Sequence, residues 1–202
     1  MIDVKFEFPK ILLSKTSDAW LDYALKNIDI LLIDHALCEK KAALSAISML
    51  YSYGEYEKII LNMPKLAREE LRHFEMVVAI LRKRGVEYKP IRASRYASSL
   101  YKKIASSGEE RFLDQLVLAA FIEARSYERF AALSTCSKWE LADFYRRLCH
   151  SEWRHYLLFI DIAKEYFSHD SVEEKILLFA KYEAQLIDST DSLFRVHSGV
   201  PF

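Results

Sequence analysis

Two short motifs place a carboxylate and an imidazole three residues apart, and each has the chemistry of half a metal site. They are Glu70-Leu-Arg-His73 and Glu152-Trp-Arg-His155, both in segments with helical hydrophobic spacing. On a helix, residues i and i+3 project from the same face, so the glutamate and histidine of each motif point together. Carboxylates and imidazoles that converge inside a helical bundle suit divalent iron and manganese alike. The motifs therefore predict a metal centre whose remaining ligands come from other segments.

Two further glutamates stand on apolar stripes, where a solvated acid is out of place. Glu39 shares a helix face with leucine and alanine residues, and Glu123 ends the run Leu-Val-Leu-Ala-Ala-Phe-Ile. Glu70 follows Glu39 by 31 residues and Glu152 follows Glu123 by 29, so the two halves repeat one pattern. Two single-glutamate helices and two Glu-x-x-His helices are the ligand set of a di-iron four-helix bundle. The competing interpretation, glutamates on solvated faces, is disfavoured because buried unpaired acids are costly.

The composition favours long helices and excludes several classes of protein. Apolar residues make up 51% of the 202 residues, and four glycines and four prolines interrupt them sparsely. The 29 basic and 29 acidic residues cancel, so net charge indicates no particular partner. Three cysteines without a Cys-x-x-Cys pair predict a reducing cytoplasm. The sequence lacks an apolar run near the ~20 residues of a membrane span and the core of a signal peptide, so no membrane partner is expected.

Hydrophobic periodicity and capping residues predict an all-α fold. A serine followed three residues later by glutamate opens each of the last three helices, at Ser107, Ser137 and Ser171. Pro64 suits the first turn of the second long helix. The expected helices cover residues 18–53 with a break near 27–29, then 64–84, 107–133, 137–167 and 171–194. The connection 85–108 is long for a compact domain, where ~4–6 residues are usual.

Four segments carry these motifs. They read Leu-Ile-Asp-His-Ala-Leu-Cys-Glu-Lys-Lys-Ala from Leu32, Leu-Ala-Arg-Glu-Glu-Leu-Arg-His-Phe-Glu from Leu66, Ile-Glu-Ala-Arg-Ser-Tyr-Glu-Arg-Phe from Ile122, and Ser-Glu-Trp-Arg-His from Ser151. Together they resemble the MiaE family of tRNA 2-methylthio-N6-isopentenyladenosine hydroxylases, over about residues 20–167. Trp153 departs from the family pattern, because a small residue is expected between these two ligand positions.

The resemblance implies a ferritin-like four-helix bundle with a long crossover between helices two and three. One domain, residues 1–202, would have its bundle core at about 26–167 and an accessory helix at about 171–195. The implied cofactor is two iron ions in a non-haem di-iron centre. Its six implied ligands are Glu39, Glu70, His73, Glu123, Glu152 and His155, with Glu70 and Glu152 the best candidates to bridge both ions.

The implied reaction is hydroxylation of the isopentenyl group of a modified adenosine 3′ of the anticodon. One oxygen atom of dioxygen is inserted, and two electrons come from a ferredoxin-type donor, because the chain has no flavin, nicotinamide or iron–sulfur fingerprint. The basic stretch 82–103 is the candidate tRNA contact, because Lys and Arg neutralise phosphates and tyrosines stack on bases. Its candidate residues are Arg82, Lys83, Arg84, Lys89, Arg92, Arg95, Lys102 and Lys103. Without the resemblance, a solvated loop would be preferred.

Some neighbouring residues have two interpretations. His35 and Asp34 lie one turn before the first implied ligand, and either could hydrogen-bond it, as ligands usually require. Glu128 is a possible alternative to Glu123, although the 29-residue interval favours Glu123. Tyr127 could border the site or belong to the core. Two other functions compete with the hydroxylase: a ferritin- or rubrerythrin-like protein that oxidises iron or scavenges peroxide, and a helical binding module without metal.

Overall fold

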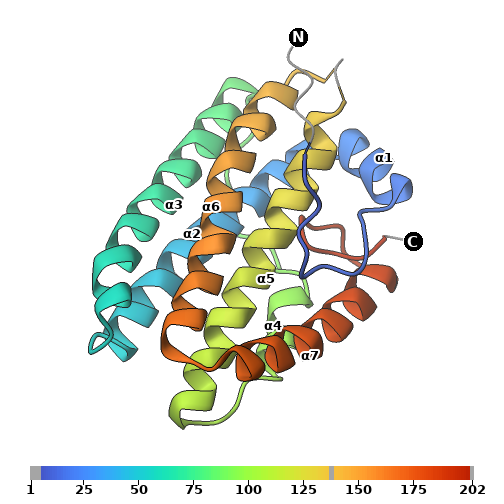
Figure 1. Cartoon of the computed structure of the whole chain (residues 1–202). Coiled ribbons are helices and arrows are strands. Elements are labelled where there is room, and N and C mark those ends of the chain that lie inside the picture. Colours follow the sequence, from blue (N-terminus) through green and yellow to red (C-terminus); the bar gives the residue numbers. More distant parts are fainter. Residues whose placement is uncertain (1–5, 137–138, 201–202) are drawn as a thin grey trace. The chain divides into compact units, whose positions relative to one another are not determined.

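The computed structural model describes residues 6–136 and 139–200. These residues form seven helices and no strand, which confirms the predicted all-α class (Figure 1). The helices are α1 (Asp18–Lys26), α2 (Ile28–Ser52), α3 (Glu57–Lys83), α4 (Tyr96–Tyr101), α5 (Gly108–Ser134), α6 (Ala142–Tyr166) and α7 (His169–Asp188). None of the helices in this part of the chain combines the length and apolar character needed to cross a membrane.

The chain divides into two compact units, and the single-domain prediction stays a prediction. The first unit contains residues 1–22, 95–192 and 197–202, and the second contains residues 23–94 and 193–196. In the second unit α2 packs along α3. In the first unit α5 packs along α6, and α7 packs against α4, α5 and α6. Each unit thus contains one long helical pair.

In the second unit, the pair packs through apolar residues that recur at helical spacing. Leu32, Ala36 and Ala43 are almost fully buried on α2, and Val77 and Leu81 are fully buried on α3. Residues four and seven positions apart lie on one helix face, so these side chains form continuous stripes. The stripes also carry the acids and histidines of the site.

In the first unit, α5 is buried on nearly all sides because α6 and α7 cover different faces of it. Phe121 stacks on Phe179 of α7, with ring centroids 6.2 Å apart. Val117 and Ala124 of α5 and Ala163 of α6 are fully buried. The buried residues of α5 include charged side chains as well as apolar ones, among them Glu123, Arg125 and Arg129.

The start of α3 and the end of α7 were predicted wrongly, and one connection predicted to be non-helical contains a helix. The helix α3 begins at Glu57 instead of residue 64 and contains Pro64, because the burial of Ile59 and Met63 outweighs the proline's missing hydrogen bond. The helix α7 ends at Asp188 instead of 195, because the chain turns back and the backbone N–H of Asp191 donates to the carbonyl of Val200. The short helix α4, with Tyr96 and Leu100 buried, interrupts the connection predicted to be non-helical.

The predicted serine caps differ in outcome. Ser107 occupies the N-cap position of α5, but its side chain makes no capping hydrogen bond there. Ser168, instead of Ser171, caps α7, and its hydroxyl accepts the Ser171 N–H at 3.2 Å. The expected cap Ser137 lies outside the described residues, and α6 begins at Ala142. The break between the first two helices is confirmed at Asn27.

Candidate metal centre

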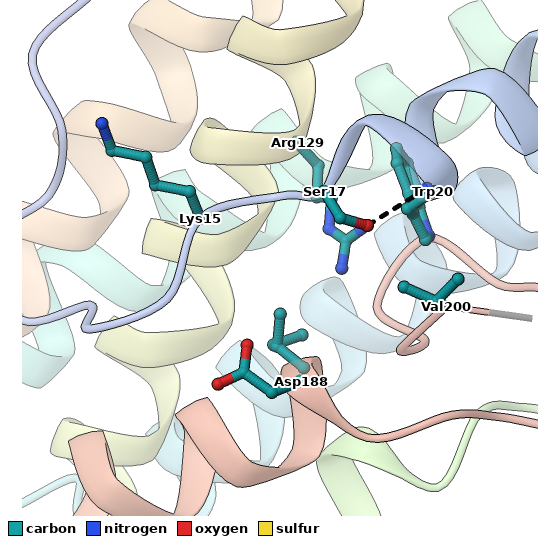
Figure 2. Close-up of a pocket in the computed structure, with 7 residues that line it drawn as sticks. Lys15, Ser17, Trp20, Arg129, Asp188 and Val200 are labelled. Atoms are coloured by element: carbon teal, nitrogen blue, oxygen red, sulfur yellow. Dashed lines mark hydrogen bonds between the residues drawn. The ribbon is translucent and has the colours of Figure 1, made fainter.

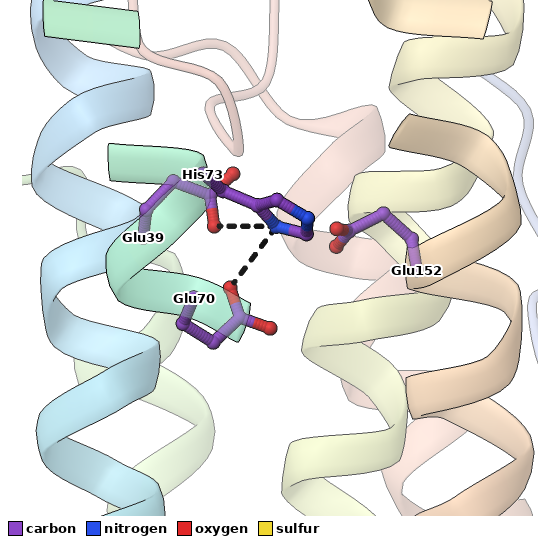
Figure 3. Close-up of side chains that lie close together, drawn as sticks. All are labelled: Glu39, Glu70, His73 and Glu152. Carbon is purple, nitrogen blue, oxygen red and sulfur yellow. Dashed lines mark ion pairs between the residues drawn. The ribbon is translucent and has the colours of Figure 1, made fainter. Parts of the chain in front are cut away.

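In the second unit, α2 and α3 bring together two carboxylates and one imidazole. Glu39 on α2 and Glu70 and His73 on α3 are all buried. Each offers one ligand atom, and these atoms lie within 4.8 Å of one another. Nδ1 of His73 is 3.7 Å from Oε2 of Glu39 and 3.7 Å from Oε2 of Glu70 (Figure 3). We call these three residues the α2–α3 group.

In the first unit, α5 and α6 repeat the arrangement. Glu123 on α5 and Glu152 and His155 on α6 are buried, and each offers a ligand atom within 4.8 Å of the others. Nδ1 of His155 is 3.7 Å from Oε2 of Glu123, the distance that separates His73 from Glu39. We call these residues the α5–α6 group. The sequence repeat is therefore also a repeat of side-chain geometry.

The carboxylates of the α2–α3 group act strongly on the neighbouring imidazole. Burial lowers the pKa of His73, but Glu39 and Glu70 outweigh burial and raise it to about 9. Burial likewise raises the pKa of Glu39, but hydrogen bonding to His35 and His73 brings it well below its usual range. The Glu39 carboxylate is therefore anionic, and a cation of either kind, a proton on the ring or a metal ion, is stabilised there.

The donor chemistry of both groups fits a divalent iron or manganese ion. Each group has one nitrogen and two carboxylate donors at buried positions, the set that such ions accept. Two buried carboxylates within 4.8 Å repel each other unless a cation lies beside them. A metal ion would supply that charge, and the imidazole would bind it in the neutral form.

The ambiguity between His35 and Asp34 is settled by their contacts. Nε2 of His35 lies 2.5 Å from Oε1 of Glu39, and the ring is fully buried. Asp34 instead accepts the backbone N–H of Val196 at 2.8 Å and lies 3.5 Å from Nε of Arg195. His35 is thus the neighbour that contacts the site, whereas Asp34 holds the C-terminal segment of its unit.

Other residues raised as alternatives have different partners. Glu128 accepts hydrogen bonds from Arg125 at 2.8 Å and from the backbone N–H of Thr16 at 2.7 Å. The Tyr127 ring packs on Trp153, with centroids 4.9 Å apart. Trp153, the departure from the family pattern, therefore belongs to an aromatic cluster of the first unit.

Five of the eight candidate tRNA-contacting residues lie in the second unit, and all five are exposed. Arg82 and Lys83 end α3. Arg84 lies 3.2 Å from Asp29, and Lys89 lies 3.0 Å from the exposed Glu87. Arg92 is exposed, while its carbonyl accepts a hydrogen bond from Arg195.

The other three candidate tRNA-contacting residues lie in the first unit and differ in their contacts. Arg95 is partly buried, with Nε 2.7 Å from Oδ1 of Asp191 and Nη2 donating to the Ser189 hydroxyl. The Lys103 ammonium lies over the Tyr182 ring, 3.8 Å from its centroid. Lys102 is exposed.

The chain as a whole is similar to known proteins of one family. The family model for tRNA-(MS[2]IO[6]A)-hydroxylase (MiaE) matches residues 4–198. The tRNA 2-(methylsulfanyl)-N(6)-isopentenyladenosine(37) hydroxylase of Pseudomonas putida is 42% identical over 186 residues, covering 92% of this chain and 91% of that protein. The Salmonella typhimurium protein of the same name is 32% identical over 235 residues, covering 92% and 87%.

The fold has a counterpart among solved structures. A protein with aldehyde deformylating oxygenase activity from Synechococcus matches with a TM-score of 0.91 and 32% identity. The match covers 95% of this chain and 98% of that one. The predicted ferritin-like fold is thereby confirmed.

Proposed function

The chain belongs to the MiaE family of tRNA hydroxylases, and from this premise we propose that its two Glu–Glu–His groups hold the iron of the catalytic centre. Its function is hydroxylation of tRNA at the isopentenyl group of 2-methylthio-N6-isopentenyladenosine, 3′ of the anticodon. The predicted enzyme class is confirmed, whereas storage of iron, scavenging of peroxide and metal-free binding have no support from these relatives.

The observation that carries the metal proposal is the repeated geometry. Each group pairs an imidazole Nδ1 with a carboxylate oxygen at 3.7 Å, and each holds a second glutamate beside it. We assign one iron ion to the α2–α3 group and one to the α5–α6 group, in keeping with the family resemblance. When bound, the iron supplies the activation of dioxygen that hydroxylation of an unreactive carbon requires.

The protein's own residues have distinct parts in this scheme. The two carboxylates of each group offset the charge of one divalent ion, and its imidazole adds a neutral nitrogen ligand. His35 contacts the Glu39 oxygen and so fixes the orientation of that carboxylate. The buried apolar stripes around the groups keep bulk water from them, which strengthens every charge interaction there.

The partners follow from the reaction. Dioxygen is the proposed oxidant, and the two electrons are proposed to come from a ferredoxin-type protein, since the sequence has no redox-cofactor motif of its own. The cytoplasm is the proposed location, because tRNA is found there. Exposed basic residues of the stretch 82–103 are proposed to contact the tRNA backbone, with Arg82 and Lys83 at the end of α3 as first candidates.

The test is the metal content of protein purified without chelator. We expect about two irons per chain in the wild type, as in other di-iron bundles. A Glu70→Ala, Glu152→Ala double variant should lose this iron. Glu75→Ala with Glu165→Ala removes exposed acids from the same two helices and should keep it. Modified nucleosides of tRNA are then assayed in all three proteins.

Absence of iron above background in the wild type, even after anaerobic addition of ferrous iron, would overturn the metal proposal. Equal loss of iron in the exposed-acid control would also contradict it, because the loss would then not depend on the buried groups. Iron in the expected amounts without tRNA hydroxylation would locate the error in the substrate.

A further inference from the structure

A second polar feature lies in the first unit, in the part of α5 that follows Glu123. The Arg129 side chain is almost fully buried, with 1% of its surface exposed. Its Nη2 donates to the carbonyl of Ser198 at 2.9 Å, and its Cζ lies 3.9 Å from the centroid of the Trp20 ring. Within the described residues, its Nε and Nη1 have no hydrogen-bond partner.

The acids near Arg129 are bound to another arginine. Glu183 accepts from Nε and Nη2 of Arg125 at 2.7 and 3.0 Å, and Glu128 accepts from Nη1 at 2.8 Å. Burial and the neighbouring Arg125 lower the pKa of Arg129 to about 9. A buried cation is costly without an anionic partner, so the site around Arg129 favours an added negative charge.

Arg129 lines a cavity of about 140 Å³ (Figure 2). Trp20 and Ile187, both buried, line its inner side with Arg129, whereas Lys15 and Asp188 are exposed. The Ser17 hydroxyl oxygen accepts a hydrogen bond from the backbone N–H of Trp20 at 3.2 Å, which leaves the hydroxyl hydrogen as a donor. The cavity therefore offers guanidinium and hydroxyl donors behind a polar rim.

We propose that this cavity binds a small oxyanion, such as inorganic phosphate, on the unused N–H groups of Arg129. Charge-assisted hydrogen bonds from a guanidinium to an oxyanion are short and strong, and its planar fork matches two oxygens. Ser17 donates a further hydrogen bond. The anion joins the segment before α1, the helix α5 and the C-terminal end of α7, whose residues line the cavity.

A negative charge at the rim of the cavity weakens binding of the proposed anion. The Asp188 carboxylate accepts from the Ser14 hydroxyl at 2.8 Å and places a negative charge at the cavity. This charge opposes an anion, so its removal strengthens binding. In Figure 2 the Lys15 ammonium points away from Arg129, so we assign Lys15 no direct contact.

The site is independent of the proposed metal function, and its test measures neither iron nor hydroxylation. Melting temperature and calorimetric binding are followed as phosphate replaces chloride at constant ionic strength. Saturable binding stabilises the folded state, so the melting temperature should rise with phosphate. The proteins compared are the wild type, Arg129→Met, Asp188→Asn and, as a control with an exposed arginine of the same unit, Arg147→Met.

We expect a saturable rise in the wild type and in Arg147→Met, and its loss in Arg129→Met. Asp188→Asn should reach half-saturation at a several-fold lower phosphate concentration. An equal rise in Arg129→Met would be a general salt effect and would overturn the proposal. No rise in the wild type would also overturn it, leaving ordered water as the partner of Arg129. If Arg129→Met does not fold, an unchanged half-saturation in Asp188→Asn contradicts the proposal by itself.

Discussion

Nε2 of His35 lies 2.5 Å from Oε1 of Glu39, one turn along the same helix. The other Glu39 oxygen, Oε2, lies 3.7 Å from Nδ1 of His73. Both oxygens of this carboxylate therefore face an imidazole in a buried environment. The contact from His35 restricts rotation of the carboxylate and holds one oxygen toward the α2–α3 group.

Replacing His35 should therefore weaken metal binding without removing a ligand. Residues that orient a ligand typically contribute 10–100-fold to metal affinity. We expect His35→Leu to lower iron affinity by about this factor and His35→Gln, which keeps a donor, to recover part of it. Competition with a chelator measures the affinity. His169→Leu, at an exposed histidine, is the control, and affinity unchanged in His35→Leu would show that Glu39 is positioned by the helix alone.

A second prediction concerns the buried pair Arg125–Glu183. Both side chains are fully buried, and two hydrogen bonds join them. Removing one partner of such a pair leaves a buried charge unpaired and costs roughly 3–5 kcal/mol. Glu183→Gln should therefore lower the free energy of unfolding by an amount of this order, measured by urea denaturation. Glu174→Gln, on the exposed side of α7, should change it little. A loss below about 1 kcal/mol for Glu183→Gln would be that of an ordinary hydrogen bond.

A third prediction separates basic residues that bind tRNA from those that stabilise the fold. Arg82 and Lys83 are exposed, whereas Arg95 is bound to Asp191 and Ser189. Removing one cation that neutralises a phosphate reduces the slope of log affinity against log salt by about 0.7–0.9. We expect Arg82→Ala and Lys83→Ala each to weaken tRNA binding and reduce this slope. Arg95→Ala should instead lower the melting temperature and keep the slope. Wild-type slopes in Arg82→Ala and Lys83→Ala would place the tRNA-binding surface elsewhere.

The sequence was sufficient to identify the two buried groups because their signal is local. A glutamate and a histidine three residues apart on one helix stay together whatever the helix packs against. Glu39 and Glu123 were identified because an acid within an apolar stripe is conspicuous. The all-α class was also predictable, because sparse glycine and proline and helical hydrophobic spacing are properties of short stretches of sequence.

Features that depend on distant segments were not predicted. The Arg125–Glu183 pair joins residues 58 positions apart, and nothing around either residue indicates the other. The start of α3 was predicted near Pro64, because proline is common in the first turn of a helix. The burial of Ile59, which extends the helix back to Glu57, depends on packing that the sequence does not show. The last helix was predicted to reach about Phe194, but α7 ends at Asp188 and the Phe194 ring packs against Tyr23, with centroids 5.1 Å apart.

The last prediction concerns the pH dependence that a buried thiol gives to stability. Cys149 on α6 is 1% exposed, and burial raises the pKa of its thiol from 9.0 to about 12. Between these values the unfolded chain loses the thiol proton while the folded protein keeps it. The folded state therefore binds more protons, and stability falls as pH rises above 9. Each pH unit lowers the free energy of unfolding by about 1.4 kcal/mol at most, so the wild type should lose up to about 2 kcal/mol of stability between pH 9 and 10.5.

Urea denaturation of the wild type and of Cys149→Ala across this pH range isolates the effect of the Cys149 thiol, because all other groups titrate in both proteins. The half-buried Cys136 serves as control, and Cys136→Ala should follow the wild type more closely than Cys149→Ala does. Parallel profiles for the wild type and Cys149→Ala would mean that the thiolate is as well accommodated in the folded protein as in water.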